Sequence, residues 1–289
     1  MRHPLLNLLK QTALAVSGHG LGRVKPVRWA YDHLYQWLKP RWVWVQGHRM
    51  FLDKQDTLEL ATREIYEPLE TKLLLERLKP GQTFVDIGAN IGYYTLLAAR
   101  QVGPQGKVYA FEPDTENFKL LQKNIEINGY SNVTLIAQAV SNQSGEAKLY
   151  LNPLNLGDHR LVDTKDGRAS ISIQQVALDD YFKQLETLPH FIKMDIQGAE
   201  SGALAGMKEL LARCASLILV TEFGPEGLRR FGADPKDYLT ALTLAGFKIS
   251  EISEKTGALQ SLDLKELPNR YPAGDEGYTN LLCEKDSHA

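Results

Sequence analysis

The sequence has few cysteines, no long apolar run and no excess of charge of either sign. Its two cysteines, Cys214 and Cys283, form no C-x-x-C pair, which argues against a zinc site and favours a reduced setting. No segment reaches the roughly 18 unbroken apolar residues of a membrane span. The chain carries 33 basic and 35 acidic residues, a net charge of −2, so it lacks the basic footprint of a nucleic-acid-binding protein. We therefore expect a cytoplasmic protein with no nucleic-acid partner.

Residues 1–80 are predicted to form an N-terminal extension of helices and a hairpin. Residues 1–17 repeat apolar side chains at helical spacing, which predicts an amphipathic helix that packs on the domain or on a partner. A helix in contact with a membrane surface and a signal peptide stay open as alternatives. Residues 27–38 indicate a helix whose aromatic face packs in the core; a wall of the acceptor site or a homodimer interface is the alternative. A hairpin is predicted over 42–52, and two helical pieces over 57–79, separated at Pro68.

Residues 81–289 are predicted to form the catalytic domain, because strand and helix patterns alternate there. The order predicts an α/β fold with a seven-stranded, mostly parallel sheet and helices on both faces. Two extra strands, over 145–151 and 170–176, flank a polar loop at 152–169. The other predicted strands cover 84–87, 107–111, 133–137, 191–195, 217–222, 247–252 and 278–283, and the predicted helices cover 114–128, 178–185, 199–213 and 235–245.

The most informative stretch is residues 86–92, with the sequence D-I-G-A-N-I-G. It follows a short apolar strand and precedes a helix, so free backbone N–H groups and the helix N-terminus would face a ligand. The spacing matches neither the dinucleotide fingerprint G-x-G-x-x-G nor a P-loop. An NAD-dependent oxidoreductase is therefore only an alternative.

Two acids indicate which ligand this turn would hold. Asp86, at the end of the first strand, suits a ligand that carries an ammonium group. Glu112 follows the second strand, where a doubly wound sheet binds a ribose through its two hydroxyls. An ammonium group at one end and a ribose at the other describe S-adenosylmethionine.

Four stretches of the chain resemble the FkbM-type methyltransferases, which belong to the class I S-adenosylmethionine-dependent group. The resemblance implies a Rossmann-like fold, S-adenosylmethionine as the cofactor, and O-methylation of a hydroxyl on a small molecule or saccharide. Gln197 departs from the family pattern, in which an acid is common, and we interpret this position as tolerant. The four stretches are residues 86–95, 111–113, 139–141 and 193–200.

The motifs and the resemblance together predict a cofactor site. Gln138 and Ala139 would lie at the edge of the adenine, and Glu67 over the methionine end; an exposed helical Glu67 is the alternative. The predicted cofactor-binding residues are Glu67, Asp86, Gly88, Asn90, Gly92, Tyr94, Glu112, Pro113, Gln138, Ala139 and Asp195.

A hydroxyl acceptor must also lose a proton, so a general base or a metal is expected near the methyl group. Asp195 and Glu222 end neighbouring strands, and Lys193 lies two residues before Asp195 on the same face. His159, in the polar loop, is a further candidate for the base, although it could simply bond to Asp158. Mg²⁺ between the two strand-end acids is a weaker expectation, because no dedicated ligand spacing is present. RNA ribose methylation stays open as a second alternative, since Lys193, Asp195 and Glu222 faintly resemble a Lys-Asp-Lys-Glu tetrad.

Overall fold

The computed structural model describes residues 5–6, 33–153, 155–183, 185–272, 274 and 277–286. The chain divides into two compact units, residues 1–66 and 67–289. This division falls earlier than the boundary predicted at residue 80. Most of the helix predicted over 1–17, and half of the helix predicted over 27–38, lie outside the described residues. Within the described part, no helix has the length and apolar character needed to cross a membrane.

The first unit contains a short helix over residues 33–38 and a two-stranded hairpin. Strands β1 (Trp42–Val45) and β2 (His48–Phe51) pair antiparallel, as predicted. The turn places Gln46 and Gly47 at φ +48° and +80°, the left-handed geometry that a two-residue hairpin loop requires.

The prediction of a helix over 57–67 is wrong, because these residues form turns. The Asp53 carboxylate accepts the backbone N–H groups of Gln55 and Thr57, and the Asp56 carboxylate accepts that of Ala61. Such local side-chain acceptors compete with the hydrogen bonds of a helix.

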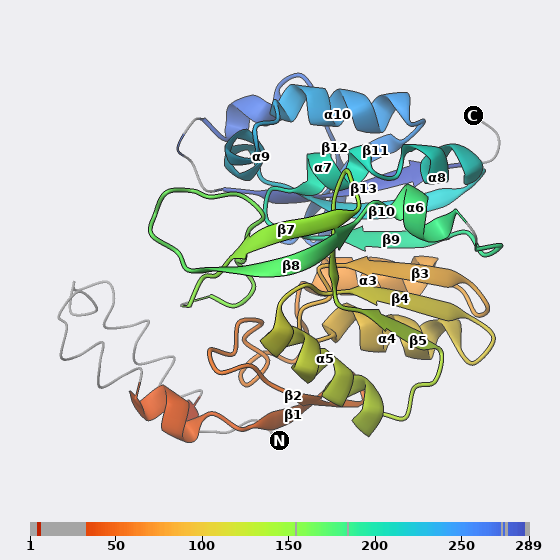
Figure 1. The fold of residues 1–289 in the computed structure, drawn as a ribbon. Helices are drawn as coiled ribbons and strands as arrows, with labels where there is room; N and C mark the ends of the chain where they lie inside the picture. The colour runs from red at the N-terminus through yellow and green to blue at the C-terminus, as the bar shows by residue number, and fades with distance from the viewer. Residues whose placement is uncertain are drawn as a thin grey trace. The chain divides into compact units, whose positions relative to one another are not determined.

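The second unit is built on an eight-stranded sheet in the order β12-β11-β13-β10-β9-β3-β4-β5 (Figure 1). The strands β5, β4, β3, β9 and β10 run parallel, whereas β13 is antiparallel to both β10 and β11. The predicted α/β class is confirmed. The strand beyond the predicted seven is β12, a short and mostly exposed segment without apolar alternation. The bounds are β3 Thr83–Ile87, β4 Lys107–Phe111, β5 Val133–Ile136, β9 Phe191–Met194, β10 Leu217–Phe223, β11 Lys248–Ser253, β12 Ala258–Ser261 and β13 Thr279–Lys285.

Alternation along the central strands divides the side chains between two helical layers. Val85, Ile192 and Leu219 share one core with Leu204 of α7 and Leu239 of α10. The neighbouring positions of β3 and β9 point to the opposite face, where α3 and α4 pack against each other and α4 packs on β3. The helices are α3 Pro68–Arg77, α4 Tyr93–Val102, α5 Thr115–Ile127, α6 Leu178–Phe182, α7 Glu200–Ala205, α8 Lys208–Arg213, α9 Pro225–Phe231 and α10 Pro235–Leu244, with a 3-10 turn over Leu267–Arg270.

The helix predicted over 199–213 is instead two helices, α7 and α8, which separate at Gly206. A Cβ at Gly206 would lie 2.0 Å from the carbonyl oxygen of Ser141. The chain therefore bends where it passes a neighbouring backbone, and a longer straight helix would not fit there.

The two extra strands are confirmed as part of a separate three-stranded sheet. Its strands are β6 (Gln138–Val140), β8 (Ser170–Val176) and β7 (Gly145–Tyr150), in that order. In Figure 1, β7 and β8 lie in front of the large sheet, and the loop between them extends to the left.

Candidate active site

The glycine turn after β3 is determined by a close contact with the end of β9. Gly88 has φ +83°, and a Cβ there would lie 2.1 Å from the carbonyl oxygen of Asp195. Gly92, at φ +95°, is the N-cap of α4, and a Cβ there would meet the Leu121 side chain at 2.7 Å. Only glycine accommodates both the left-handed backbone and the lack of space.

The expectation that this turn offers free backbone N–H groups is wrong for most of it. The N–H groups of Gly88 and Ala89 both donate to the carbonyl of Phe111, and that of Gly92 donates to the carbonyl of Ala89. The turn is thus tied to the end of β4. What remains available to a ligand is the N-terminal end of α4 and the side chains around it.

Glu112, directly after β4, binds the glycine turn. Its Oε2 accepts the N–H of Asn90 at 2.8 Å, and its Oε1 accepts the N–H of Asp114 at 2.9 Å. Burial raises the pKa of Glu112 to about 8. Each oxygen keeps acceptor capacity for a further donor. Beside it, the Oδ1 atom of Asn90 is buried and has no hydrogen-bond partner in the described part of the chain. These unused acceptors fit a ligand with hydroxyl or ammonium donors, as S-adenosylmethionine has.

Asp86 lies inside β3 rather than at the rim, with only 2% of its surface exposed. Its Oδ2 accepts the hydroxyl of Thr95 on α4 at 2.5 Å. In the sheet register it is paired with Lys193 of β9. Burial raises the pKa of Asp86 to about 6, and the hydrogen bond from Thr95 and the charge of Lys193 act in the opposite direction.

A chain of buried polar contacts runs from Lys193 to the start of α3. The Lys193 Nζ lies 3.0 Å from Oε1 of Glu70, and Oε2 of Glu70 accepts the Asn280 amide of β13 at 2.7 Å. The same amide donates to Glu67 at 3.1 Å, and the Tyr94 hydroxyl donates to the other oxygen of Glu67 at 2.7 Å. Burial raises the pKa of Glu67 and that of Glu70, the latter to about 8, whereas the charge of Lys193 acts to lower both.

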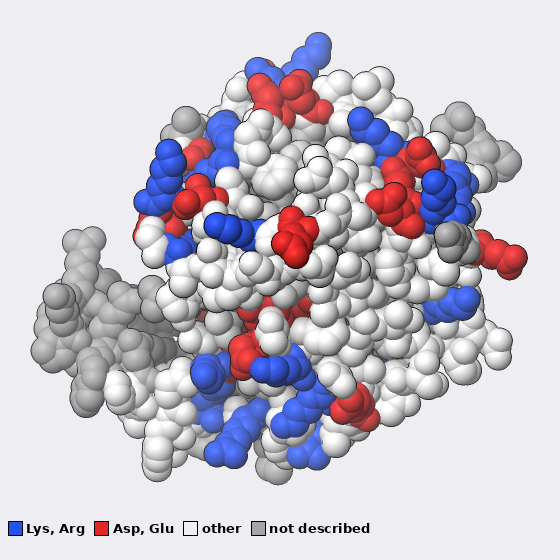
Figure 2. All heavy atoms as spheres, viewed as in Figure 1, with Lys and Arg blue, Asp and Glu red and all other residues white. Residues whose placement is uncertain are grey.

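The structure also brings together the two strand-end acids. Asp195 Oδ1 and Glu222 Oε2 both accept the Gln197 amide, at 2.8 and 3.3 Å. Burial raises the pKa of Glu222 well above its usual range, and the charge of Asp195 adds to the effect. The Asp195 side chain is 28% exposed, and its Oδ2 lies 3.6 Å from Lys193 Nζ. Figure 2 shows acidic side chains at the bottom of a hollow near the middle of the face that is drawn. Gln197 therefore bridges the two acids, and its interpretation as a tolerant position stays a prediction.

His159 lies apart from these acids in the hydrogen-bond network. Its Nδ1 accepts the N–H of Asn152 at 3.0 Å, and its Nε2 lies 3.8 Å from Oδ2 of Asp114, the N-cap of α5. Burial lowers the pKa of His159, although Asp114 and Asp158 oppose this. A neutral imidazole bonded in this way presents no free lone pair. Its role as a base stays a prediction that this arrangement does not favour.

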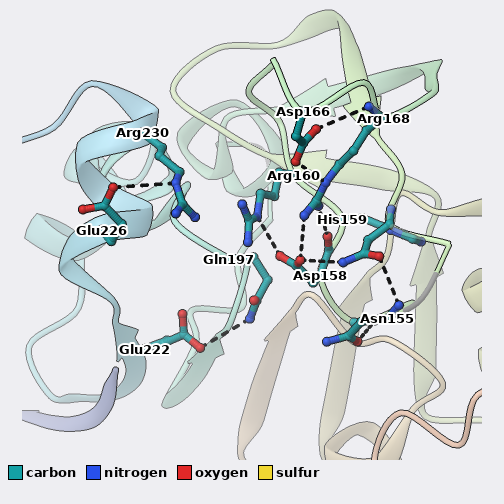
Figure 3. A network of polar contacts seen from close by, with 12 residues as sticks. Asn155, Asp158, His159, Arg160, Asp166, Arg168, Gln197, Glu222, Glu226 and Arg230 are labelled. Carbon is teal, nitrogen blue, oxygen red and sulfur yellow. Dashed lines mark hydrogen bonds and ion pairs between the residues drawn. The ribbon is translucent and has the colours of Figure 1, made fainter. Parts of the chain in front are cut away.

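The polar loop has an internal organisation that the sequence did not reveal. Asp158 accepts hydrogen bonds from Arg160 at 2.6 Å, from Arg168 at 2.9 Å and from Asn152 at 2.7 Å. The backbones of Tyr150 and Arg160 form a bridge that closes the loop. In Figure 3, Arg160 points from this loop toward Gln197.

Three further residues were predicted to bind the cofactor. Pro113 is half-buried between Glu112 and the cap of α5. Gln138 and Ala139 lie in β6, where Gln138 is paired with Gln174 of β8. Their contacts with an adenine stay predictions.

Glu70, Asn280 and Thr95 were missed by the sequence analysis. Glu70 lies on the apolar face of α3, adjacent to Leu69 and close to Leu73. An acidic residue at a position that the helical pattern predicts to be buried could have indicated its role. Asn280 similarly precedes the apolar run of β13. Within the described residues, no group of three His, Cys, Asp or Glu side chains could hold a metal ion.

Comparison with known proteins identifies the family. The model of the Methyltransferase FkbM domain matches residues 86–249, more than half of the chain. Methyltransferase sdnD of Sordaria araneosa is 27% identical over an alignment of 177 residues that covers 50% of this chain and 68% of that protein. Methyltransferase 1 of Beauveria bassiana is 26% identical over 151 residues, 45% of this chain and 60% of that protein. The chain thus spans only about three fifths of the second relative. The crystal structure of methyltransferase FkbM from Methylobacillus flagellatus KT is 18% identical, with a TM-score of 0.42 over 74% of this chain and 50% of that chain. The chain belongs to the FkbM methyltransferase domain family and is an S-adenosylmethionine-dependent methyltransferase.

Proposed function

We propose that the enzyme methylates the oxygen of a hydroxyl group on a small molecule or saccharide. The observation that carries this proposal is the position of Asp195. It is the partly exposed member of a group of otherwise buried acids, at the carboxyl end of β9. Parallel sheets bind their ligands at this end. A hydroxyl acceptor has to lose a proton during transfer, and a carboxylate open to the crevice can accept it.

Bound S-adenosylmethionine would supply an activated methyl group. In our proposal, Glu112 accepts the ribose hydroxyls with the acceptor capacity that the Asn90 and Asp114 N–H groups leave. Asn90 accepts a further donor through its buried Oδ1. Glu67 and Tyr94, which are bonded to each other, line the methionine end. Asp86 is too deeply buried to contact the cofactor over a large area. In our proposal it acts on the cofactor through its charge.

Lys193 and Gln197 would orient the proposed base. Lys193 holds one carboxylate oxygen of Asp195, and Gln197 holds the other. Fixing a side chain from both sides limits its rotation and aligns it with the acceptor. Glu222, whose pKa is raised, would receive the second hydrogen bond of Gln197 and keep its amide in place.

The acceptor itself would bind beneath the loop that Asp158 organises. Figure 3 shows Arg160 of this loop pointing toward Gln197, the residue that bonds to Asp195, which supports the proposal. The mixture of hydroxyl-binding groups, arginines and carboxylates suits a polar acceptor such as a sugar or hydroxylated metabolite.

A methyl-transfer screen tests the proposal. The wild-type protein and Asp195→Asn are incubated with labelled S-adenosylmethionine and hydroxylated metabolites, saccharides, amines and RNA, with and without a chelator. We expect label on hydroxylated small molecules, and a loss of about 10²–10⁴-fold in turnover for Asp195→Asn with little change in cofactor affinity.

Each arm of this screen distinguishes the proposed reaction from one alternative. Label on RNA would favour ribose methylation, and label on amines would refute the choice of oxygen. Loss of activity with chelator would indicate that Mg²⁺ assists at Asp195 and Glu222. Wild-type turnover of Asp195→Asn would remove Asp195 as the base.

We also propose a reducing compartment such as the cytoplasm. Cys214 and Cys283 are both free and buried, and burial raises the pKa of each thiol. Such thiols are unreactive and need no disulfide for stability. A homodimer and a helix at 1–17 on a membrane surface stay hypotheses.

A further inference from the structure

The tryptophans of this chain are confined to one short stretch. All four, at positions 29, 37, 42 and 44, fall between residues 29 and 44, and residues 67–289 contain none. Three of them are described: Trp37 and Trp44 are largely uncovered, 79% and 61% exposed, and Trp42 is 38% exposed. Large aromatic side chains left in water indicate a surface that binds a partner.

The hairpin β1–β2 presents two of these rings on one face. Trp42 is paired across the strands with Phe51, and Trp44 with Arg49. The Trp42 and Trp44 rings meet edge to face with centroids 6.4 Å apart, and the Arg49 guanidinium lies 4.4 Å from the Trp42 centroid. We refer to Trp42, Trp44, Arg49 and Phe51 as the tryptophan face. The opposite face carries Val45 and Met50, which are 2% and 1% exposed.

The remaining part of the first unit keeps the tryptophans outside. The Tyr35 hydroxyl donates to Asp56 at 2.7 Å, and Lys39 Nζ donates to the carbonyl of Asp53 at 2.5 Å. These bonds fasten the helix over 33–38 to the segment after the hairpin. Trp37 is therefore exposed on a helix that is held in place, and not on a loose end.

The two units differ in net charge much more than the small net charge of the whole chain suggests. Residues 1–66 contain 10 basic and 5 acidic side chains, a net +5, while residues 67–289 contain 23 and 30, a net −7; together these give the −2 of the whole chain. Residues 33–52, which carry the described tryptophans, include three basic side chains, Lys39, Arg41 and Arg49, and no acidic one. The tryptophan-bearing unit thus attracts anions.

We propose that the tryptophan face and Trp37 bind the surface of a membrane that contains anionic lipids. Indole rings favour the headgroup region because one edge is polar and the rest apolar. Arginine and lysine side chains are drawn to anionic headgroups while their stems stay in apolar contact. A second copy of the same face would bring two net positive units together, so the charge pattern favours lipid over self-association.

The absence of tryptophan from the second unit gives a direct assay. Because every indole lies in the first unit, intrinsic tryptophan fluorescence of the whole protein reports on this unit alone. Phosphatidylcholine vesicles that contain phosphatidylglycerol are titrated into the wild-type protein. We expect a blue shift and protection from acrylamide quenching, and at least about tenfold weaker binding to phosphatidylcholine alone or at high salt.

Matched variants identify the surface by vesicle co-sedimentation. Trp44→Ala is expected to weaken binding about tenfold, whereas Leu244→Ala, which removes a side chain 83% exposed on α10, is expected to leave it unchanged. Arg41→Glu should weaken binding by about fivefold for each of its two units of charge. Lys208→Glu makes the same charge change at an exposed site on α8 and should have no effect.

Several outcomes would overturn the proposal. They are the absence of a vesicle-induced shift, equal binding to neutral and anionic vesicles, and equal effects of Trp44→Ala and Leu244→Ala. A fluorescence shift with RNA but not with vesicles would assign the surface to nucleic acid instead. If Trp44→Ala fails to fold, Arg41→Glu still decides the question. No arm measures methyl transfer, so the result is independent of the proposed reaction.

Discussion

Replacing Lys193 with methionine would remove the positive charge that the buried acids share. Lys193 opposes the effect of burial on the pKa of Glu67, Glu70, Asp86 and Glu222. Its own side chain is 3% exposed and that of Glu70 is 2%, with 3.0 Å between the charged atoms. Methionine keeps most of the length and volume of lysine, so the change is mainly one of charge.

The size of the effect depends on pH. Breaking a buried ion pair by removing one partner costs about 3–5 kcal/mol when the other stays ionised. Burial raises the pKa of Glu70 to about 8 even beside the lysine, from 4.5. Between these values the folded state binds a proton that the unfolded state releases, so this group makes stability fall as pH rises.

Without the lysine, the pKa of Glu70 rises further. The pH range in which the folded state holds the extra proton, called the window below, therefore extends upward. Each pH unit inside the window is worth about 1.4 kcal/mol for one proton. Wild type and variant share this window up to about pH 8, so their stabilities diverge further only above it. We therefore expect Lys193→Met to lose about 4 kcal/mol of unfolding free energy near pH 8.5 and about 3 kcal/mol near pH 6.5.

Denaturant unfolding of wild type and Lys193→Met at the two pH values measures this difference. Glu70→Gln and the double variant provide the control, because a neutral glutamine needs no counter-charge. The double variant should be more stable than Lys193→Met at the higher pH. An equal loss at both pH values, or a double variant that is no more stable than the single one, would refute the reasoning.

The remaining predictions concern three other residues. Glu112→Ala should weaken S-adenosylmethionine binding by about 1.5–3 kcal/mol, or roughly 10- to 150-fold, measured by calorimetry, because hydrogen bonds between the ribose and this buried carboxyl group are lost. Glu254→Ala should lower the unfolding free energy by about 1 kcal/mol in denaturant, because this carboxylate accepts the N–H groups of Leu69 and Glu70 at the start of α3. His159→Ala should reduce turnover less than about tenfold, because both ring nitrogens face partners.

Each of these has a control in the same region. Glu116→Ala removes an acid that is 69% exposed at the start of α5 and should not change cofactor affinity; unchanged affinity of Glu112→Ala would count against the ribose contact. Lys255→Ala alters the exposed neighbour of Glu254 and should be neutral. A loss of 100-fold or more in His159→Ala, with cofactor affinity intact, would restore His159 as the base.

Much of the site followed from the sequence because its elements are local. The glycine turn, Asp86 in β3, Glu112 after β4, and the strand-end pair Asp195 and Glu222 lie within or directly after strands that apolar patterns reveal. Parallel strands then bring their carboxyl ends together, and the Gln197 bridge between the two acids agrees with that expectation. Local turn chemistry misled the prediction at 57–67, where Asp53 and Asp56 bind nearby N–H groups in place of a helix.

The amino-acid sequence by itself determined most of the order of strands and helices, the glycine turn and the family, because these depend on residues close together along the chain. Only the tertiary structure decided the partners of Lys193. Glu70 and Asn280 are 210 positions apart, and they meet because β13 enters the sheet between β10 and β11. It also decided that His159 bonds to Asn152 and lies beside Asp114. Such contacts depend on how distant segments pack, and no local pattern of side chains records them.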